Sequence, residues 1–318
     1  MSKPHKNTTT SLEGRIIKGV AGSYVISTAE GEFTCNPRGV FRNRNMTPLV
    51  GDLVAITPNQ SASTANRAGK IGTLHTIHPR RNTLRRPPMA NIDQVIITVA
   101  TAQPAFNAGL LDRFLVLIAY EDIPVVICVN KIDLNEPTAS ASEFEPYRMA
   151  GYPIIYTSAK PAEASVSNIL PDPAEINGLA DLRKVMHGRL NILAGPSGVG
   201  KSSLINALSP SLSLETGDLS VKLGRGKHTT RHSEIFQLGE TPEAGYCADT
   251  PGFTSLETTH IPKEALGRLF REFLPHISDC KFNNCLHHKE INCGVKAEVG
   301  TSIHPARYES YVKILMNA

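Results

Sequence analysis

Short runs of alternating or β-rich residues, separated by Gly, Pro and Asn, fill the chain from Leu12 to about His78. Runs of this length between turn residues predict β-strands. We expect five of them, at residues 14–20, 23–28, 32–36, 52–57 and 71–77. Five short strands in succession are typical of an OB-type β-barrel, although an SH3-like barrel would give nearly the same pattern.

The next segment, residues 79–90, combines arginines with prolines. It is too polar and too rigid for the interior of a helix or strand, because proline fixes its backbone angle and lacks an N–H group. We therefore expect a basic, proline-rich linker here.

Beyond this linker, buried strands and helical patterns alternate. We expect strands at 95–100, 125–129, 154–157 and 190–194, and helical patterns at 110–118, 179–187 and 201–208. This alternation predicts an α/β fold, in which helices cover both faces of a parallel sheet. Residues 161–177 have three prolines and little periodicity, so we interpret them as an exposed insertion.

Past Thr259 the pattern becomes helical, first at 263–273 and again in a short final helix at 305–315. The patterns together predict a chain of several parts. These are a flexible N-terminus (1–11), a β-barrel domain (12–78), the linker (79–90), an α/β domain (91–262) and a helical domain (263–318).

Composition and charge are those of an ordinary globular protein, with 41% hydrophobic residues, 19% charged residues and a net charge of +4. The chain has no run of eighteen apolar residues, and its opening residues are polar. We therefore expect a cytoplasmic protein without a membrane partner. We also expect a monomer.

A phosphate-binding loop is the strongest motif. GPSGVGKS fits the pattern G-x-x-x-x-G-K-[ST] and lies where a predicted strand ends and a helix begins. Small residues let backbone N–H groups surround phosphates, while Lys201 reaches the β- and γ-phosphates and Ser202 offers a hydroxyl to Mg²⁺. We assign to nucleotide binding Gly195, Pro196, Ser197, Gly198, Val199, Gly200, Lys201, Ser202 and Ser203.

Two base-reading motifs lie upstream of this loop, each at the end of a predicted strand. The first is Asn130, Lys131, Ile132 and Asp133, and the second contains Ser158, Ala159 and Lys160. A carboxylate such as Asp133 can accept two hydrogen bonds from guanine, and adenine offers neither in that geometry. Either motif alone is weak, but the two in order with a phosphate loop favour GTP.

The remaining motif is Asp-Thr-Pro-Gly, which supplies Asp249 to Mg²⁺ and the N–H of Gly252 to the γ-phosphate. Between it and the phosphate loop lies a basic stretch, GRGKHTTR, suited to a switch loop. Thr229 or Thr230 in that stretch could complete the magnesium coordination, alongside Ser202 and Asp249.

A cluster near the end of the chain has the spacing Cys280-x4-Cys285-x-His287-x5-Cys293. Three thiolates and one imidazole form the ligand set of a closed tetrahedral zinc site, and a closed site has a structural role. We therefore expect one structural Zn²⁺. His288 is the alternative fourth ligand.

The base-reading motifs precede the phosphate loop, which reverses the order of an ordinary GTPase. The chain resembles the ribosome small subunit-dependent GTPase A (RsgA) family in several features together. These are the permuted order, the β-rich start, GPSGVGKSS, GRGKHTTR, DTPGF and the Cys/His cluster. The resemblance covers nearly the whole chain. It implies an N-terminal OB-type β-barrel, a central circularly permuted P-loop GTPase domain and a C-terminal α-helical zinc-binding domain.

The resemblance also implies GTP hydrolysis to GDP and phosphate, coupled to binding of the small ribosomal subunit and its rRNA, and to release from it, late in maturation. It favours His287 over His288 as the zinc ligand. Phe253 stands where many GTPases have a water-orienting glutamine, and the resemblance and proximity point to His228 as a replacement. His228 could equally be a solvated side chain. With Lys201, Thr229 and Thr230 it forms the expected catalytic set.

Basic residues recur in three places that would suit phosphate contacts to folded RNA. They are Arg38, Arg42 and Arg44, then Arg80, Arg81, Arg85 and Arg86, and finally Arg225, Lys227 and Arg231. Two other functions remain open at this point. One is an RNA-binding assembly scaffold that uses GTP only as a structural ligand, and the other is an ATP-using P-loop enzyme.

Overall fold

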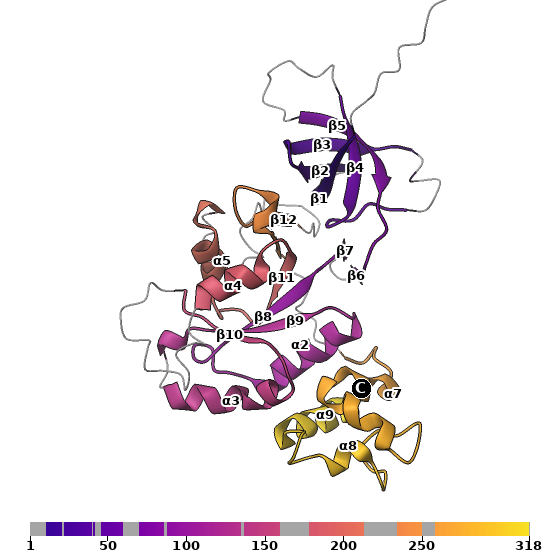
Figure 1. The fold of residues 1–318 in the computed structure, drawn as a ribbon, viewed down its shortest axis with the longest axis vertical. Helices are drawn as coiled ribbons and strands as arrows, with labels where there is room; N and C mark the ends of the chain where they lie inside the picture. The colour runs from indigo at the N-terminus through magenta and orange to yellow at the C-terminus, as the bar shows by residue number, and fades with distance from the viewer. Residues whose placement is uncertain are drawn as a thin grey trace, which may run out of the picture.

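A computed structural model describes residues 11–20, 22–39, 41, 46–59, 70–85, 88–134, 137–159, 178–212, 234–249 and 258–317. In Figure 1 the N-terminal strands form a barrel at one end of the molecule, a mixed sheet with helices occupies the middle, and short helices gather at the C-terminal end.

The barrel contains β1 (Leu12–Val20), β2 (Ser23–Thr28), β3 (Gly31–Pro37), β4 (Leu53–Pro58) and β5 (Lys70–Ile77). The strands are hydrogen-bonded in the order β1-β2-β3-β5-β4, and β4 pairs back with β1. Alternate side chains from the strands, among them Ile16, Ile26 and Leu74, fill the interior. The five predicted strands and the OB-type barrel are therefore confirmed.

The proline-rich segment differs from our expectation, because it contains strands. β6 (Thr83–Arg85) and β7 (Pro88–Ala90) form an antiparallel ribbon. Leu84, Met89 and Ala90 are buried, so the apolar residues of the two strands hold the ribbon against the core. Pro88 is the first residue of its strand, a place where a missing N–H group is tolerated.

The central sheet has the parallel order β10-β9-β8-β11-β13. Its strands are β8 (Gln94–Ala100), β9 (Val125–Asn130), β10 (Ile154–Tyr156), β11 (Leu190–Ala194) and β13 (Tyr246–Asp249), and β12 (Glu234–Gln237) adds an antiparallel edge. The predicted alternation of strands and helices is confirmed. β12 was not expected from the sequence.

Helices cover both faces of this sheet. Residues of α2 (Ala108–Tyr120) and α3 (Pro137–Met149) pack in one apolar core, and residues of α4 (Gly178–Met186) and α5 (Lys201–Leu208) pack in a second. Short 3-10 turns occupy Ile132–Leu134 (η2), Pro210–Leu212 (η5) and Pro242–Ala244 (η6). The α/β fold class is thus confirmed, and it brings the carboxyl ends of five parallel strands to one edge.

The barrel and the central sheet are joined by hydrogen-bonded strands. β1 pairs antiparallel with β12 at Lys18 and Glu234, whose side chains form a 2.8 Å ion pair. The guanidinium of Arg15 lies 5.4 Å from the centroid of the Tyr246 ring on β13. One eleven-stranded sheet therefore runs through both parts.

The C-terminal part contains α7 (Lys263–Leu266), η7 (Gly267–Leu269), η8 (Arg271–Asp279), α8 (Gly294–Ala297) and α9 (Pro305–Asn317). The expected helix at 263–273 is wrong beyond Leu266, where 3-10 turns replace it. At Gly267 a Cβ atom would lie 2.7 Å from Cδ2 of His287, so this turn is packed directly against the imidazole. No helix among the described residues is long and apolar enough to cross a membrane.

Candidate functional site

The predicted phosphate loop connects β11 to α5, as its sequence required. Gly195, Gly198 and Gly200 all have positive φ angles, of 134°, 81° and 96°. Lys201 Nζ donates to the carbonyl oxygens of Gly195 and Pro196, each at 2.8 Å. The ammonium group therefore lies over the loop that is expected to surround the phosphates.

The first base-reading motif contacts this loop directly. Asn130 ends β9 and is almost fully buried, and its Nδ2 donates to the carbonyl of Val199 at 2.8 Å. Thr157 Oγ1 donates to Asn130 Oδ1 at 3.1 Å and also contacts the Cys128 thiol at 3.3 Å. These bonds fix the Asn130 amide, so that the base-reading strand and the phosphate loop meet.

The second base-reading motif contacts the first. Ser158 Oγ donates to Asp133 Oδ1 at 2.8 Å, and Ile132 N donates to the Thr157 carbonyl at 3.3 Å. Asp133 itself is exposed, where a base can reach it. The structure thus places next to one another two motifs that are far apart in the sequence, and Ala159 lies beside them after β10.

A loop that the sequence did not indicate completes this edge. It runs from Thr101 to Asn107, between β8 and α2. Lys131 Nζ donates to the Gln103 carbonyl, and Thr101 Oγ1 donates to the Lys131 carbonyl at 3.1 Å. A Cβ atom on Gly198 would lie 3.7 Å from Pro104. No residue type in this loop indicates nucleotide chemistry, because its contacts are made by a backbone carbonyl, a threonine hydroxyl and an apolar ring.

Several predicted residues fall outside the described part of the chain. These are Lys160, His228, Thr229, Thr230, Gly252 and the side chain of Asp249. The backbone of Asp249 is described as the last residue of β13, next to β11 and at the same sheet edge as the phosphate loop. The assignment of individual residues to nucleotide and magnesium stays a prediction.

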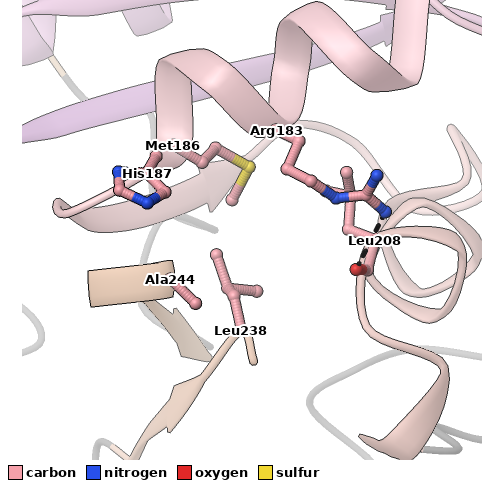
Figure 2. Close-up of a pocket in the computed structure, with 6 residues that line it drawn as sticks. All are labelled: Arg183, Met186, His187, Leu208, Leu238 and Ala244. Carbon is pink, nitrogen blue, oxygen red and sulfur yellow. Dashed lines mark hydrogen bonds between the residues drawn. The ribbon is translucent and has the colours of Figure 1, made fainter. Parts of the chain in front are cut away.

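A small pocket lies away from the phosphate loop, at the C-terminal ends of α4 and α5. Figure 2 shows its lining, with Arg183 Nη2 donating to the Leu208 carbonyl at 3.2 Å. α5 begins at the phosphate loop and ends at this pocket, about 10 Å further on. The pocket has a volume of about 80 Å³, and none of the predicted nucleotide-binding residues lines it. It is thus too small and too distant to be the nucleotide site.

The Cys/His cluster forms a compact group of four possible metal ligands. The ligand atoms of Cys280, Cys285, His287 and Cys293 lie within 4.8 Å of one another. Cys280 Sγ is 3.8 Å from Cys293 Sγ, and His287 Nδ1 is 3.5 Å and 3.4 Å from these two sulfur atoms. Tetrahedral zinc with bonds of about 2.3 Å to sulfur and about 2.0 Å to nitrogen needs separations of about 3.8 Å and 3.5 Å. The donor set fits that ion.

Burial acts in opposite ways on the two kinds of ligand, because it favours the neutral imidazole that coordinates metal but disfavours the thiolate. Burial lowers the pKa of His287, which keeps its imidazole neutral and able to coordinate. Burial raises the pKa of the Cys285 thiol to about 12, so at neutral pH a bound cation is what would remove its proton. The hydroxyl groups of Tyr308 and Tyr311 donate to the carbonyls of His287 and Leu286, at 2.9 Å and 2.6 Å. They hold the ligand loop against α9.

Two arginines of the predicted RNA-binding set have partners inside the protein. Arg80 donates to both carboxylate oxygens of Asp52, at 2.7 Å and 2.8 Å, and Asp52 is fully buried. Arg81 pairs with Asp93 at 2.5 Å. Arg38 is exposed, and nothing is described of the side chains of Arg42, Arg44, Arg85 and Arg86. The Arg81 side chain is still 59% exposed, whereas that of Arg80 is 26% exposed and bound to a buried carboxylate, so Arg80 is the less available of the two for contacts with RNA.

The chain matches two models of known protein families. The family model described as RsgA GTPase matches residues 77–259, which is more than half of the chain. The model described as RsgA N-terminal domain matches residues 13–65. The chain belongs to the RsgA GTPase family. It is accordingly an enzyme that hydrolyses GTP.

RsgA proteins of several bacteria align with almost the whole chain. One from Shouchella clausii is 41% identical over 307 residues, covering 95% of this chain and 96% of that protein. One from Geobacillus thermodenitrificans is 42% identical over 308 residues, with the same coverage. Both carry the name small ribosomal subunit biogenesis GTPase RsgA.

Solved structures of RsgA-like proteins share the fold. YloQ, described as a circularly permuted GTPase, is 35% identical, and its match has a TM-score of 0.74 and covers 99% of this chain and 97% of that one. YjeQ from Thermotoga maritima is 32% identical, and its match has a TM-score of 0.77 and covers 96% and 98%. The permuted motif order predicted from the sequence therefore has a counterpart of known structure.

Proposed function

We propose that this protein binds GTP at the sheet edge formed by the phosphate loop and the two base-reading motifs, and that its hydrolysis of GTP serves small-subunit biogenesis. The hydrogen bond from Asn130 to the Val199 carbonyl carries the proposal, because it places the base-reading motifs beside the phosphate loop. In this proposal the nucleotide state controls binding to the small ribosomal subunit and release from it.

The roles of the side chains follow from their positions. Asp133 would accept hydrogen bonds from guanine, and Ser158 holds its carboxylate in place. The ammonium group of Lys201 would leave the loop carbonyls and bind the β- and γ-phosphates instead. Ser202 and Asp249 would hold Mg²⁺, which supplies charge stabilisation to the phosphates. His228 would orient water, and Thr229 or Thr230 would join the magnesium shell.

One structural zinc ion in the Cys/His cluster completes the proposal. Cys280, Cys285, His287 and Cys293 provide four ligands, so no coordination position is left for a substrate. The cluster follows the Asp-Thr-Pro-Gly motif in the chain, and loss of the γ-phosphate would thereby reposition the C-terminal part.

The partner is proposed to be the small ribosomal subunit and its rRNA, and the names of the relatives support this choice. Exposed basic side chains such as Arg38 would contact RNA phosphates, and this attraction weakens as salt rises. We further propose that the protein acts as a cytoplasmic monomer.

Base reading can be tested by changing the hydrogen-bonding character of one side chain. Asp133→Asn should lower affinity for GTP by about 10- to 100-fold and raise affinity for xanthosine triphosphate, whose base offers the complementary oxygen. Asp181→Asn makes the same chemical change at an ion pair on the surface of α4, so it should bind GTP as the wild type does. Unchanged preference in Asp133→Asn would contradict the proposed guanine site.

The ribosomal part of the proposal needs a separate measurement. GTP turnover should rise when isolated small subunits are added, and large subunits serve as the control. A protein that binds small subunits with GTP but shows no faster turnover would instead be an RNA-binding scaffold for which GTP is a structural ligand.

A further inference from the structure

Helix α2 contributes side chains to two separate cores. Leu111, Leu115 and Ile118 pack in the core shared by the barrel and one face of the central sheet. Val116 is buried in the core of the C-terminal part, and Leu117 packs against that core. The C-terminal part accordingly lies against α2 through η7 and α9, and Figure 1 shows α9 next to α2. α2 is thus the element on which the C-terminal part rests.

A buried charged cluster crosses this contact. Arg307 of α9 is only 1% exposed, and its Nη1 donates to Asp112 of α2. Its Nε donates to Glu272 of η8 at 2.6 Å. The guanidinium also lies 4.7 Å from the ring centroid of Phe270 and 5.3 Å from that of Tyr147 on α3. One side chain therefore links α9 and η8 to α2 and α3.

The cluster holds two carboxylates against one guanidinium. Within the described part of the chain, Oε2 of Glu272 is buried and has no hydrogen-bond partner. Removing Arg307 would leave both carboxylates buried without a cation, and that is the situation in which a buried ion pair matters most. We therefore expect Arg307 to contribute to docking of the C-terminal part on α2, together with the apolar contacts of Val116 and Leu117.

The beginning of α2 is tied to the nucleotide motifs. Asn107 caps the helix by accepting from Leu110 N at 3.0 Å, and the preceding loop accepts the ammonium of Lys131 through the Gln103 carbonyl. The hydroxyl of Tyr147 donates to the Ala108 carbonyl at 3.3 Å, while the ring of Tyr147 lies beside Arg307. Asp112 lies about one helical turn after Ala108. The Arg307 cluster is thus about one turn from the loop that holds Lys131.

We propose that Arg307 is a positioning residue for the nucleotide site. It fixes α2 between the central sheet and the C-terminal part, and α2 in turn fixes the loop 101–107 against Lys131 and the phosphate loop. This inference rests on the proposed nucleotide site and deepens it. The C-terminal part would thus be coupled to the base-reading motifs through α2 and the loop 101–107, independently of the Asp-Thr-Pro-Gly motif.

Release of a fluorescent GDP analogue from the full-length protein tests the inference. Arg307→Met should release the nucleotide faster by about 2- to 30-fold, the range typical of substitutions that modulate coupling between sites. Arg307→Lys keeps the charge but not the fork of donors, so its rate should fall between those of Arg307→Met and the wild type. Arg271→Ala is the matched control. Its guanidinium lies 4.9 Å from the Tyr152 ring at the same contact but at the surface, and its rate should match the wild type.

Two further readouts separate positioning from general stability. Zinc content and the midpoint of thermal unfolding are measured for each variant. A purely structural role would lower the unfolding midpoint of Arg307→Met and leave the release rate unchanged, and that result would overturn the inference. If Arg307→Met does not fold, Asp112→Asn replaces it in the test. Faster release of the analogue from Asp112→Asn is expected, and release at the wild-type rate would overturn the inference. Failure of the wild type to bind the analogue would instead refute the nucleotide site itself.

Discussion

Glycine in the phosphate loop is required by space as well as by backbone angle. At Gly195 a Cβ atom would lie 2.0 Å from the Thr98 carbonyl oxygen of the neighbouring strand β8. At Gly200 it would lie 2.4 Å from Asn130 Nδ2. The same nitrogen holds the Val199 carbonyl, so the close approach at Gly200 is what lets the base-reading strand bind the loop.

Gly200→Ala should therefore displace Asn130 and break its bond to Val199. Loss of one buried hydrogen bond costs about 1 kcal/mol, so GDP affinity should fall by about 5- to 10-fold. Gly300→Ala is the control, since Gly300 has a similar φ of 95° but open space around its Cβ position. It should lose stability from backbone strain yet bind GDP normally. Equal GDP affinity in the two variants, measured by calorimetry, would contradict this explanation.

Single side chains also mark where sequence reasoning stopped. The chemistry of Lys201 and Asp133 is visible in the sequence, because motif and strand end coincide. Arg80 was grouped with RNA-binding arginines, but it neutralises the buried carboxylate of Asp52. Arg307 gave no signal at all, because its partners Asp112 and Glu272 are distant in the chain. Sequence patterns identify groups that act locally and miss charges whose partner is set by the fold.

At the scale of elements, hydrophobic patterning predicted most strands and helices. The five barrel strands, β11 and α5 were all found, because Gly and Pro separate them and their apolar residues follow one period. α3 was missed, since it is polar, weakly amphipathic and contains Pro146. β6 and β7 were missed because charged residues and prolines outnumber the few apolar side chains that hold the ribbon in place.

The loop that carries the Cys/His cluster, residues 280–293, contains turns and bends but neither helix nor strand. His287 has a positive φ of 53°, which places Nδ1 among the sulfur atoms, whereas the backbone N–H of His288 donates to Glu290 at 3.0 Å. The backbone conformation of this loop therefore favours His287 over the adjacent His288 as the metal ligand.

Replacing each histidine in turn tests that assignment. His288→Ala should retain one zinc ion per chain, and His287→Ala should lose it or bind it at least about tenfold more weakly, because a closed site needs all four ligands. Metal content after dialysis measures the difference. Zinc retention by His287→Ala together with loss in His288→Ala would reverse the assignment.

At the scale of the whole molecule, the described residues form three apolar cores, one of which lies under α4 and α5. The barrel and one face of the central sheet share a single apolar core, and the pairing of β1 with β12 joins residues 216 positions apart. The C-terminal part has its own core around Phe270, Phe273 and Tyr311. No local sequence pattern reveals the core that the barrel shares with the central sheet. The linker expected at 79–90 was inferred from a change in composition, and composition does not show which segments pack together. The domain boundaries stay a prediction.

This arrangement predicts how the full-length protein unfolds when metal is removed. The C-terminal core is small and is closed by the Cys/His loop, so a zinc chelator should move its unfolding to a lower temperature. The barrel and central sheet should still unfold together near the original temperature, since α2 keeps its other face in their shared core. Differential scanning calorimetry should therefore resolve two transitions with chelator.

The same calorimetric trace is expected for His287→Ala without chelator, while His288→Ala should behave as the wild type. Two transitions that separate the barrel from the central sheet would show that the β1–β12 pairing and the shared core are too weak to join them. One transition that shifts as a whole would show that α2 and the Arg307 cluster couple the C-terminal core to the rest more tightly than its own metal does.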